Sequence, residues 1–533
     1  MSGTSVDQSR QTNRPEGSGR AALLVALGIL LSRLAGLVRD RVFAYYLGSS
    51  DAADAFRAAL RIPNILQNLF GEGVLSASFI PVYARLLGSG EEETADRVAG
   101  VVGALLSLLM AVLVLIGVLA APILIDLIAP GFTGDKRSLT ILLVQILFPG
   151  IGALVLSAWC LGILNSHGRF FLSYAAPVVW NLFIIAGLVL FHSAPSLAQL
   201  VIYAAWASVA GSVAQLVVQL PTVFQVAPKI RLSLTLALAP VRNVISSFFP
   251  VFISRGVVQL SAYIDSLLAS LLPSGAVALL TYAQTIYLLP VSLFGMSISA
   301  AELPAMSRAL AGQSQEIYAQ LRDRLNRAMR RLTFFVIPSA VGFLIFGDTM
   351  AALIYQSGRF THLDATYVWS LLAGSGIGLV ASTSGRLCSS AFYALRDTRT
   401  PLIFALIRVF LTTVLGYFFA FPLPRLLGID PRWGMAGLTA SAGIAGWIEF
   451  LLLQRGLRRW LPPFVPGPEL WFRLWAAALI AAGCAYPLKL SSLGHQPILG
   501  GLIILPLFGT LYLVLTLLFR VPEARTFWRG VRR

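Results

Sequence analysis

Long apolar segments recur along the whole chain and constrain its fold more than any other feature. Two examples are ALLSLLMAVLVLIGVLAAPILI at residues 104–125 and GLIILPLFGTLYLVLTLLF at residues 501–519. Each is long enough to cross the hydrocarbon core of a bilayer as an α-helix. Only 12% of the residues are charged, whereas a soluble domain has about 25%. The chain is therefore predicted to be an all-α polytopic membrane protein.

Turn signals and charged loops divide the apolar segments into fourteen predicted transmembrane helices. Their ranges are 21–47, 52–84, 98–128, 139–164, 171–192, 198–225, 243–272, 276–307, 332–356, 364–394, 401–421, 433–454, 470–487 and 498–519. If the N-terminus is inside, the inward loops and tails hold 25 of the 40 Lys and Arg residues and the outward loops hold six. Because basic residues gather on the cytoplasmic side, both termini are predicted to be cytoplasmic and residues 356–364 to lie outside.

The net charge of +17 is explained by this loop asymmetry, and the sequence contains no RNA-binding motif or continuous basic arm. No nucleic-acid partner is predicted. Cys160, Cys388 and Cys484 lie far apart in apolar segments without the spacing of a metal site. We expect them to be small buried residues, and the sequence identifies no metal ligands.

An internal repeat indicates two lobes of the same orientation. LFGEGVLSASFIPVYARLLGSG at 69–90 resembles LFGMSISAAELPAMSRALAGQS at 293–314, and both stretches fall at the inner end of the second span of a group. A parallel repeat of six spans usually places its substrate site between the lobes near the membrane midplane. The predicted regions are a cytoplasmic tail (1–20), an N-lobe (21–226), a cytoplasmic linker (227–242), a C-lobe (243–455), two additional spans (456–519) and a basic cytoplasmic tail (520–533).

A charged stripe on the second predicted span is unusual for a membrane helix. At about 100° per residue, one narrow face is shared along roughly 27 Å by five polar residues: Asp54, Arg57, Arg61, Asn68 and Glu72. An Arg at the centre of a spanning helix costs about 3 kcal/mol on insertion scales. A simple structural explanation is an i,i+3 ion pair between Asp54 and Arg57 near the outer end. Otherwise the stripe requires a water-filled cavity or internal partners.

Further charged residues lie inside other predicted spans. They are Arg33, Arg39 and Asp40 in span 1, Arg255 and Asp265 in span 7, Glu302 in span 8 and Arg386 in span 10. Arg408 and Arg473 are expected only to snorkel or to pair. The remaining arginines outnumber the nearby carboxylates, and guanidinium groups suit phosphate. We interpret them as the lining of a cationic cavity for an anionic cargo, with Asp54, Glu72 and Glu302 as gating residues or charge partners.

The motifs of the sequence disfavour several classes of membrane protein. No Gly-Lys-Ser/Thr segment is present, as an ATP-driven pump would require, and the four histidines are isolated. No catalytic residue and no cofactor are predicted. A secondary transporter or flippase remains, with a coupling ion or the membrane potential as the open choices for its energy source. Asp265 could belong to a cation site.

Six segments carry a resemblance to a known family: SRLAGLVRD (32–40), ADAFRAALRIPN (53–64), FGEGVLSASFIPV (70–82), ILNSHGRF (163–170), QSGRFTHLDA (356–365) and AFYALRDTRTP (391–401). In order and along essentially the whole chain, they resemble the MurJ/MviN family of lipid II flippases, part of the multidrug/oligosaccharidyl-lipid/polysaccharide exporter superfamily. The resemblance implies a cationic cavity for a pyrophosphate head group and a groove for the lipid tail at the last two helices.

The family's cavity residues match several positions: Arg33, Arg39, Asp40, Asp54, Glu72 and Arg386. Three positions depart from the family pattern. Gln67 and Thr285 stand where the family has arginines, and Leu288 stands where the family has an acidic residue. We therefore hypothesise that Arg57, Arg61 and Arg255 take over the work of the missing arginines.

The predicted function is export of lipid II from the inner to the outer leaflet of the bacterial cytoplasmic membrane by alternating access. The predicted partners are the undecaprenyl-pyrophosphate-linked muropeptide lipid II, membrane lipids and, as a further class, cell-wall synthesis proteins. The alternatives are a flippase for another polyprenyl-linked saccharide, a drug or ion antiporter of the same superfamily, and a scaffold of the cell-wall synthesis complex. In-span arginines disfavour a cationic cargo, and a scaffold needs no charged cavity.

Overall fold

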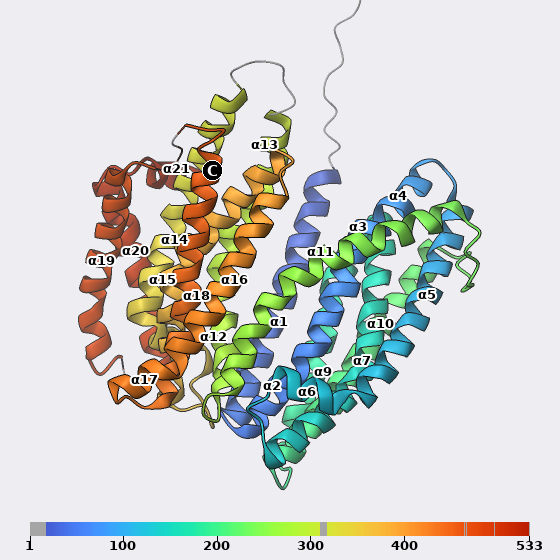
Figure 1. Cartoon of the computed structure of the whole chain (residues 1–533), viewed down its shortest axis with the longest axis horizontal. Helices are drawn as coiled ribbons and strands as arrows, with labels where there is room; N and C mark the ends of the chain where they lie inside the picture. Colours follow the sequence, from blue (N-terminus) through green and yellow to red (C-terminus); the bar gives the residue numbers. More distant parts are fainter. Residues whose placement is uncertain (1–16, 310–316, 463, 465, 495, 532–533) are drawn as a thin grey trace, which may run out of the picture.

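The computed structural model describes residues 17–309, 317–462, 464, 466–494 and 496–531 as an all-helical protein (Figure 1). The first part of the chain forms α1 (Gly17–Leu47), α2 (Asp51–Leu66), η1 (Gln67–Leu75), α3 (Ser76–Ser78), α4 (Ile80–Gly88), α5 (Glu92–Leu119), α6 (Ala121–Ile128), α7 (Gly134–Ser166), α8 (Phe170–Ala175), α9 (Pro177–Leu190) and α10 (Leu197–Val226). The second part forms α11 (Ala239–Ser270), α12 (Ala276–Pro290), η2 (Val291–Met296), α13 (Ser297–Ala309), α14 (Ile317–Tyr355), α15 (His362–Ala394), α16 (Arg399–Ala420), α17 (Pro422–Leu427), η3 (Pro431–Trp433), α18 (Gly434–Leu457), α19 (Pro468–Leu490), α20 (Pro497–Leu518) and α21 (Pro522–Val531).

The prediction of an all-helical multi-span membrane protein is confirmed. Among the described residues, eleven helices are long and apolar enough to cross a membrane. The other predicted spans coincide with α1, α2–α4 and α11, whose sequences contain the in-span charges of the first, second and seventh predicted spans. The count of fourteen therefore stays a prediction, but every predicted span has a helix at its place.

The helices form two bundles that meet at one end and separate toward the other (Figure 1). We call α1–α10 the first bundle and α12–α18 the second bundle. The closed end holds the loops 47–51, 272–276 and 356–362, and the open end holds α4 and α13. Helix α11 runs from one bundle to the other, and near its start Phe248 and Phe252 pack on Phe70 of η1. The first residues of the predicted C-lobe thus contact the first bundle.

The two copies of the sequence repeat share an irregular local structure. Leu69 and Phe70 lie in the π-helical segment η1, and Leu293 and Phe294 lie in the π-helical segment η2. Such π-segments are rare and frequently occur at functional sites. Each one follows the helix that starts at the closed end, namely α2 and α12. The repeat therefore gives both bundles a helix that is interrupted by a π-helical segment.

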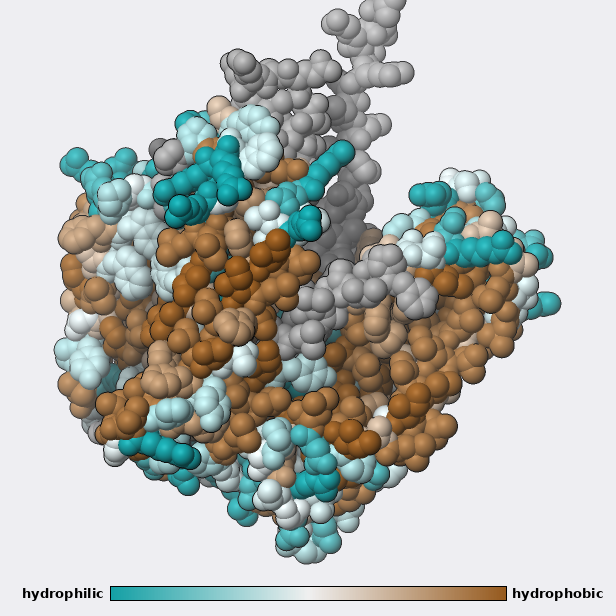
Figure 2. Space-filling model, in the orientation of Figure 1, coloured by the Kyte–Doolittle hydropathy of each residue, from teal (hydrophilic) through white to brown (hydrophobic). Residues whose placement is uncertain are grey.

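The outer surface of the bundles is apolar between two polar ends (Figure 2). Exposed Leu402, Leu406 and Phe410 follow one face of α16, as expected for side chains that contact lipid. The expectation for the cysteines is correct for Cys160 and Cys388, which are buried, and wrong for Cys484, which is exposed. Because the outside of a membrane helix is as apolar as its core, hydropathy does not distinguish the two environments.

Candidate functional site at the bundle interface

Asp54 joins the two bundles at the closed end. It is 1% exposed near the start of α2, and its carboxylate accepts hydrogen bonds from the backbone amides of Gly275 (2.7 Å) and Ala278 (2.8 Å). These amides belong to the first turn of α12 in the second bundle. The first amides of a helix lack intrahelical partners and carry partial positive charge. Asp54 therefore caps a helix of the opposite bundle.

Lys136 completes this contact from α7. Its ammonium group lies 2.6 Å from Asp54 and 2.8 Å from Asp51, and Asp51 also accepts a hydrogen bond from Ser274 of the second bundle (2.6 Å). The simple ion pair between Asp54 and Arg57 is thus wrong, because each side chain has another partner. A Lys and the amides of α12 neutralise Asp54.

Three more hydrogen bonds connect the loops of the closed end. The hydroxyl of Ser49 donates to Asp364 (2.5 Å), the hydroxyl of Tyr282 donates to the carbonyl of Gly48 (3.1 Å), and the amide of Arg359 donates to the carbonyl of Tyr45 (2.8 Å). The backbones approach closely here.

Two glycines permit this close approach. Gly48 has φ +54° and a Cβ there would lie 2.6 Å from the carbonyl oxygen of Arg359. Gly275 has φ +93° and a Cβ there would lie 2.6 Å from the carbonyl oxygen of Ser49. Both the backbone conformation and the space therefore favour glycine at these positions.

Asp40 is the centre of a charge cluster deeper in the interface. It is 3% exposed and lies 2.9 Å from Arg39 and 3.0 Å from Arg57. The hydroxyl of Thr285, from the second bundle, donates to its other oxygen at 3.3 Å. Two guanidinium groups thus share one carboxylate, which leaves an excess of positive charge.

The two arginines of this cluster differ in accessibility. Arg57 is buried, with its guanidinium 4.2 Å from the ring centre of Phe43 and 5.2 Å from that of Tyr282. The side chain of Arg39 is 19% exposed and also donates to Asn181 of α9 at 3.0 Å. Arg57 is therefore enclosed by protein, whereas Arg39 keeps a part of its surface free.

Farther along α2, the stripe becomes more accessible. Arg61 donates to Gln284 of the second bundle at 3.3 Å and is partly exposed, and Asn68 is exposed. Arg33 on α1 and Arg386 on α15 are exposed as well. Among the described residues, hydrogen bonds between the two bundles extend from the closed end as far as Arg61.

The remaining predicted residues have varied environments. Glu302 lies 3.9 Å from Arg324 of its own bundle. As expected, Arg408 pairs with Glu449 at 3.1 Å and Arg473 pairs with Glu469. The side chains of Glu72 and Arg255 lie outside the described residues.

Asp265 is the predicted candidate for a cation site. One of its carboxylate oxygens is buried without a hydrogen-bond partner in the described part of the chain. Within the same residues, no group of three or more His, Cys, Asp or Glu side chains could hold a metal ion.

Sequence reasoning missed several residues around these charges. Lys136 counted only as a basic residue of an outward loop, although it binds Asp54. Asn181 is the single amide in the apolar run PVVWNLFIIAGLVL, which is a signal that could have been used. Tyr282 and Gln284 carry no such signal, because their importance depends on a partner from the other bundle.

The fold and the interface define a two-bundle, multi-span membrane transporter whose halves enclose a cationic region. Comparison with known proteins identifies the particular family. The sequence profile described as "Lipid II flippase MurJ" matches residues 43–506. The chain therefore belongs to the MurJ family, whose members are flippases and not enzymes.

Individual relatives agree with this assignment. The lipid II flippase MurJ of Burkholderia cenocepacia is 32% identical over 493 residues, which cover 90% of this chain and 92% of that protein. A solved structure, "Lipid II flippase MurJ, inward closed conformation", has a TM-score of 0.76 and 26% identity, and covers 96% of this chain and 100% of that one. An inward-facing multidrug resistance transporter of the MATE family has a TM-score of 0.65 at 18% identity, covering 82% and 98%, which shows a shared fold.

Proposed function

We propose that this chain moves lipid II from the inner to the outer leaflet of a bacterial cytoplasmic membrane by alternating access. The observation that carries the proposal is the gradient along the bundle interface. Carboxylates and backbone amides lock the closed end, and partly exposed arginines lie between the lock and the open end. This is the arrangement that an inward-open binding state requires.

Arg39 is the first proposed contact of the pyrophosphate head group. It already offers a guanidinium fork to Asp40, with hydrogen bonds of 3.1 and 2.9 Å. A pyrophosphate can replace the carboxylate on this fork, because the oxygens of a carboxylate and of a phosphate both accept paired hydrogen bonds from a guanidinium group. Asp40 would then keep Arg57 as its partner. Arg33 and Arg386 would attract the anion from the open end, and Arg57 would contact it only if the cluster rearranges.

The positions of the missing family arginines support the relocation hypothesis. Thr285 donates to Asp40, and Arg61 donates to Gln284, the residue directly before Thr285. An arginine at Thr285 would therefore lie beside the same cluster that Arg61 approaches from α2. We propose that Arg61, together with Arg255 from α11, supplies this charge here.

The orientation in the membrane is part of the proposal. The open end would face the cytoplasm and the closed end the outside, with both termini cytoplasmic. A cysteine at Ser357, in a closed-end loop, should react with an impermeant reagent added outside, whereas a cysteine at exposed Glu91 should not. Cys484 has to be replaced first, since it is exposed. The reverse pattern would contradict the orientation.

The functional test is rescue of a bacterium depleted of its own lipid II flippase. The chain should restore growth and exposure of lipid II on the outer leaflet. Normal expression without restored lipid II exposure would favour another polyprenyl-linked saccharide as the cargo. Rescue that persists after the cavity arginines are removed would favour a scaffold of the cell-wall synthesis complex.

A further inference from the structure

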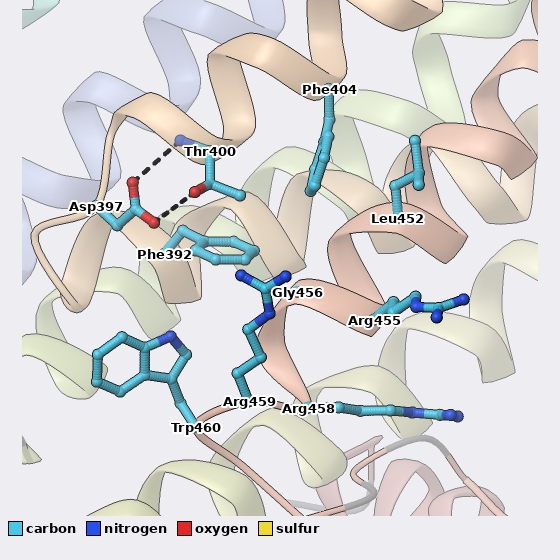
Figure 3. A pocket seen from close by; sticks show the side chains of 10 residues that line it. All are labelled: Phe392, Asp397, Thr400, Phe404, Leu452, Arg455, Gly456, Arg458, Arg459 and Trp460. Atoms are coloured by element: carbon cyan, nitrogen blue, oxygen red, sulfur yellow. Dashed lines mark hydrogen bonds between the residues drawn. The ribbon is translucent and has the colours of Figure 1, made fainter.

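A basic cavity lies away from the bundle interface, at the open end of the second bundle. It has a volume of about 800 Å³ between the α15–α16 loop, the start of α16 and the end of α18 (Figure 3). Its polar side is formed by Arg455, Arg458 and Arg459, and its apolar wall includes Phe392 and Phe404. The cavity therefore combines concentrated positive charge with an apolar surface.

The three arginines lie at the end of α18, where Arg455 and Arg458 extend to one side and Arg459 extends separately toward Phe392 (Figure 3). Their i, i+3 and i+4 spacing places them close together, and all three are exposed. None of them forms an ion pair with a described residue, unlike Arg408 and Arg473. The partial negative charge at the C-terminal end of α18 explains one or two basic residues. It does not explain why a cavity lies beside them. In Figure 3 the side chain of Arg459 extends into this cavity.

The one acidic residue of the lining is occupied by its own loop. Asp397 accepts hydrogen bonds from the amide (3.0 Å) and the hydroxyl (2.6 Å) of Thr400. These hydrogen bonds hold the pKa of Asp397 below its usual value. Figure 3 shows the carboxylate turned toward Thr400. Asp397 thus shapes the loop, and the lining keeps a net positive charge.

The surroundings of the cavity favour a lipid over a soluble anion as its ligand. Exposed Ile403 and Ile407 on α16, each three residues after a lining residue of the cavity, and exposed Leu451 on α18 extend from it along the apolar outer surface. At the rim, Trp460 stacks on Tyr318 with ring centres 6.4 Å apart. Trp and Tyr side chains typically lie at the level of lipid head groups.

We propose that this cavity binds the phosphate of an anionic membrane phospholipid. Arg455, Arg458 and Arg459 hold the head group, and the acyl chains lie along the exposed apolar faces of α16 and α18. Basic pockets between membrane helices on the cytoplasmic side bind anionic lipid head groups in this way. The site is separate from the bundle interface, so this inference goes beyond the proposed function.

The test measures lipid retention by the full chain in nanodiscs of phosphatidylcholine, with and without phosphatidylglycerol. Native mass spectrometry counts the phosphatidylglycerol that stays bound after mild delipidation. Replacing Arg455, Arg458 and Arg459 by Gln should weaken retention roughly 100-fold, since each basic group near the surface contributes to binding. The matched control replaces Arg169, Arg231 and Arg242, three exposed arginines of other segments, and should bind like the parent.

A single Arg459→Gln variant keeps the test decisive if the triple variant does not fold, and it should weaken retention roughly fivefold. Three results would overturn the proposal. The first is equal retention by the parent and both variants. The second is equal retention of phosphatidylcholine by the parent. The third is displacement of phosphatidylglycerol by inorganic phosphate or pyrophosphate, which would make this a site for soluble anions. No lipid II is present, so the outcome is independent of the proposed function.

Discussion

The two ends of the bundle interface use charged residues differently. At the closed end, Asp54 and Asp364 each bind defined groups from both bundles, and their oxygens have little access to water. Toward the open end, Arg33 and Arg386 are exposed. A buried ion pair is strongly destabilised when one partner is removed, whereas an exposed guanidinium is available to a ligand. The closed end therefore holds the two bundles together in this conformation, whereas the arginines toward the open end have the exposure that the proposed cargo binding requires.

Removing the cap at the closed end should have the largest effect. Asp54→Ala leaves the first amides of α12 without their acceptor and Lys136 with Asp51 as its remaining counter-charge, and breaking a buried pair of this kind costs about 3–5 kcal/mol. We expect the closed end to separate. Spin labels at exposed residues 135 and 426, in a Cys484→Ala background, should report a longer distance in this variant. Asp126→Ala is the control, because Asp126 pairs with Arg137 on the surface. Unchanged distances in both variants would show that Asp54 does not hold the bundles together.

Removing cavity arginines should abolish transport while the closed end stays shut. Ala at Arg39, Arg61 or Arg255 is expected to eliminate rescue of the depleted strain, because charge-assisted hydrogen bonds contribute about 1.5–3 kcal/mol each. Membrane insertion and the distance between the labels should be unaffected. Arg39→Lys should be poorly tolerated if the guanidinium fork is used and better tolerated if charge alone matters. Arg473→Ala, which removes a surface ion pair, is the control. Full activity of Arg61→Ala and Arg255→Ala would show that these two residues are only structural.

Restoring the family's arginine positions should have an intermediate effect. Gln67→Arg and Thr285→Arg, added to an inactive Arg61→Ala, Arg255→Ala background, should recover part of the rescue. Thr285 lies 3.3 Å from Asp40, so an arginine there can join the cluster. The same two additions in the parent chain serve as the control for expression and insertion. No recovery, despite normal expression, would argue against relocation of the charge.

The smallest effect is expected at a carboxylate that serves only its own loop. Asp397 has a lowered pKa because Thr400 donates hydrogen bonds to it. Its stabilising contribution is therefore present above the pKa of the unfolded chain and is lost as the pH falls through the lower folded pKa. Asp397→Asn should slightly lower thermal stability at neutral pH, and the difference from the parent should vanish in acid. A difference in thermal stability that grows in acid would contradict this assignment. The distances between the spin labels should not change in this variant.

The sequence was sufficient for much of this comparison. Hydropathy located the helices because each segment must satisfy its backbone hydrogen bonds within the membrane. The in-span charges identified Asp40 and Asp54 as important, since such residues are costly without partners. The Leu-Phe-Gly repeat also identified two equivalent segments, although nothing in it indicated that both are π-helical.

The partners of these charges were not predictable. Asp54 binds backbone amides of Gly275 and Ala278, and an amide has no side-chain signature in the sequence. The predicted stripe assumed a regular helix through Glu72, but η1 begins at Gln67 and its i→i+5 hydrogen bonds change the facing of the residues that follow. Contacts between bundles depend on the conformation of the whole molecule, so local patterns do not encode them.

The most direct test of alternating access measures both ends of the interface in one reconstituted sample. One label pair, at 135 and 426, reports the closed end, and a second pair, at exposed residues 91 and 398, reports the open end. On addition of lipid II, we expect a population in which the closed-end distance increases and the open-end distance decreases together. If lipid II crosses the membrane while both distances stay unchanged, the two ends do not alternate and the account is wrong.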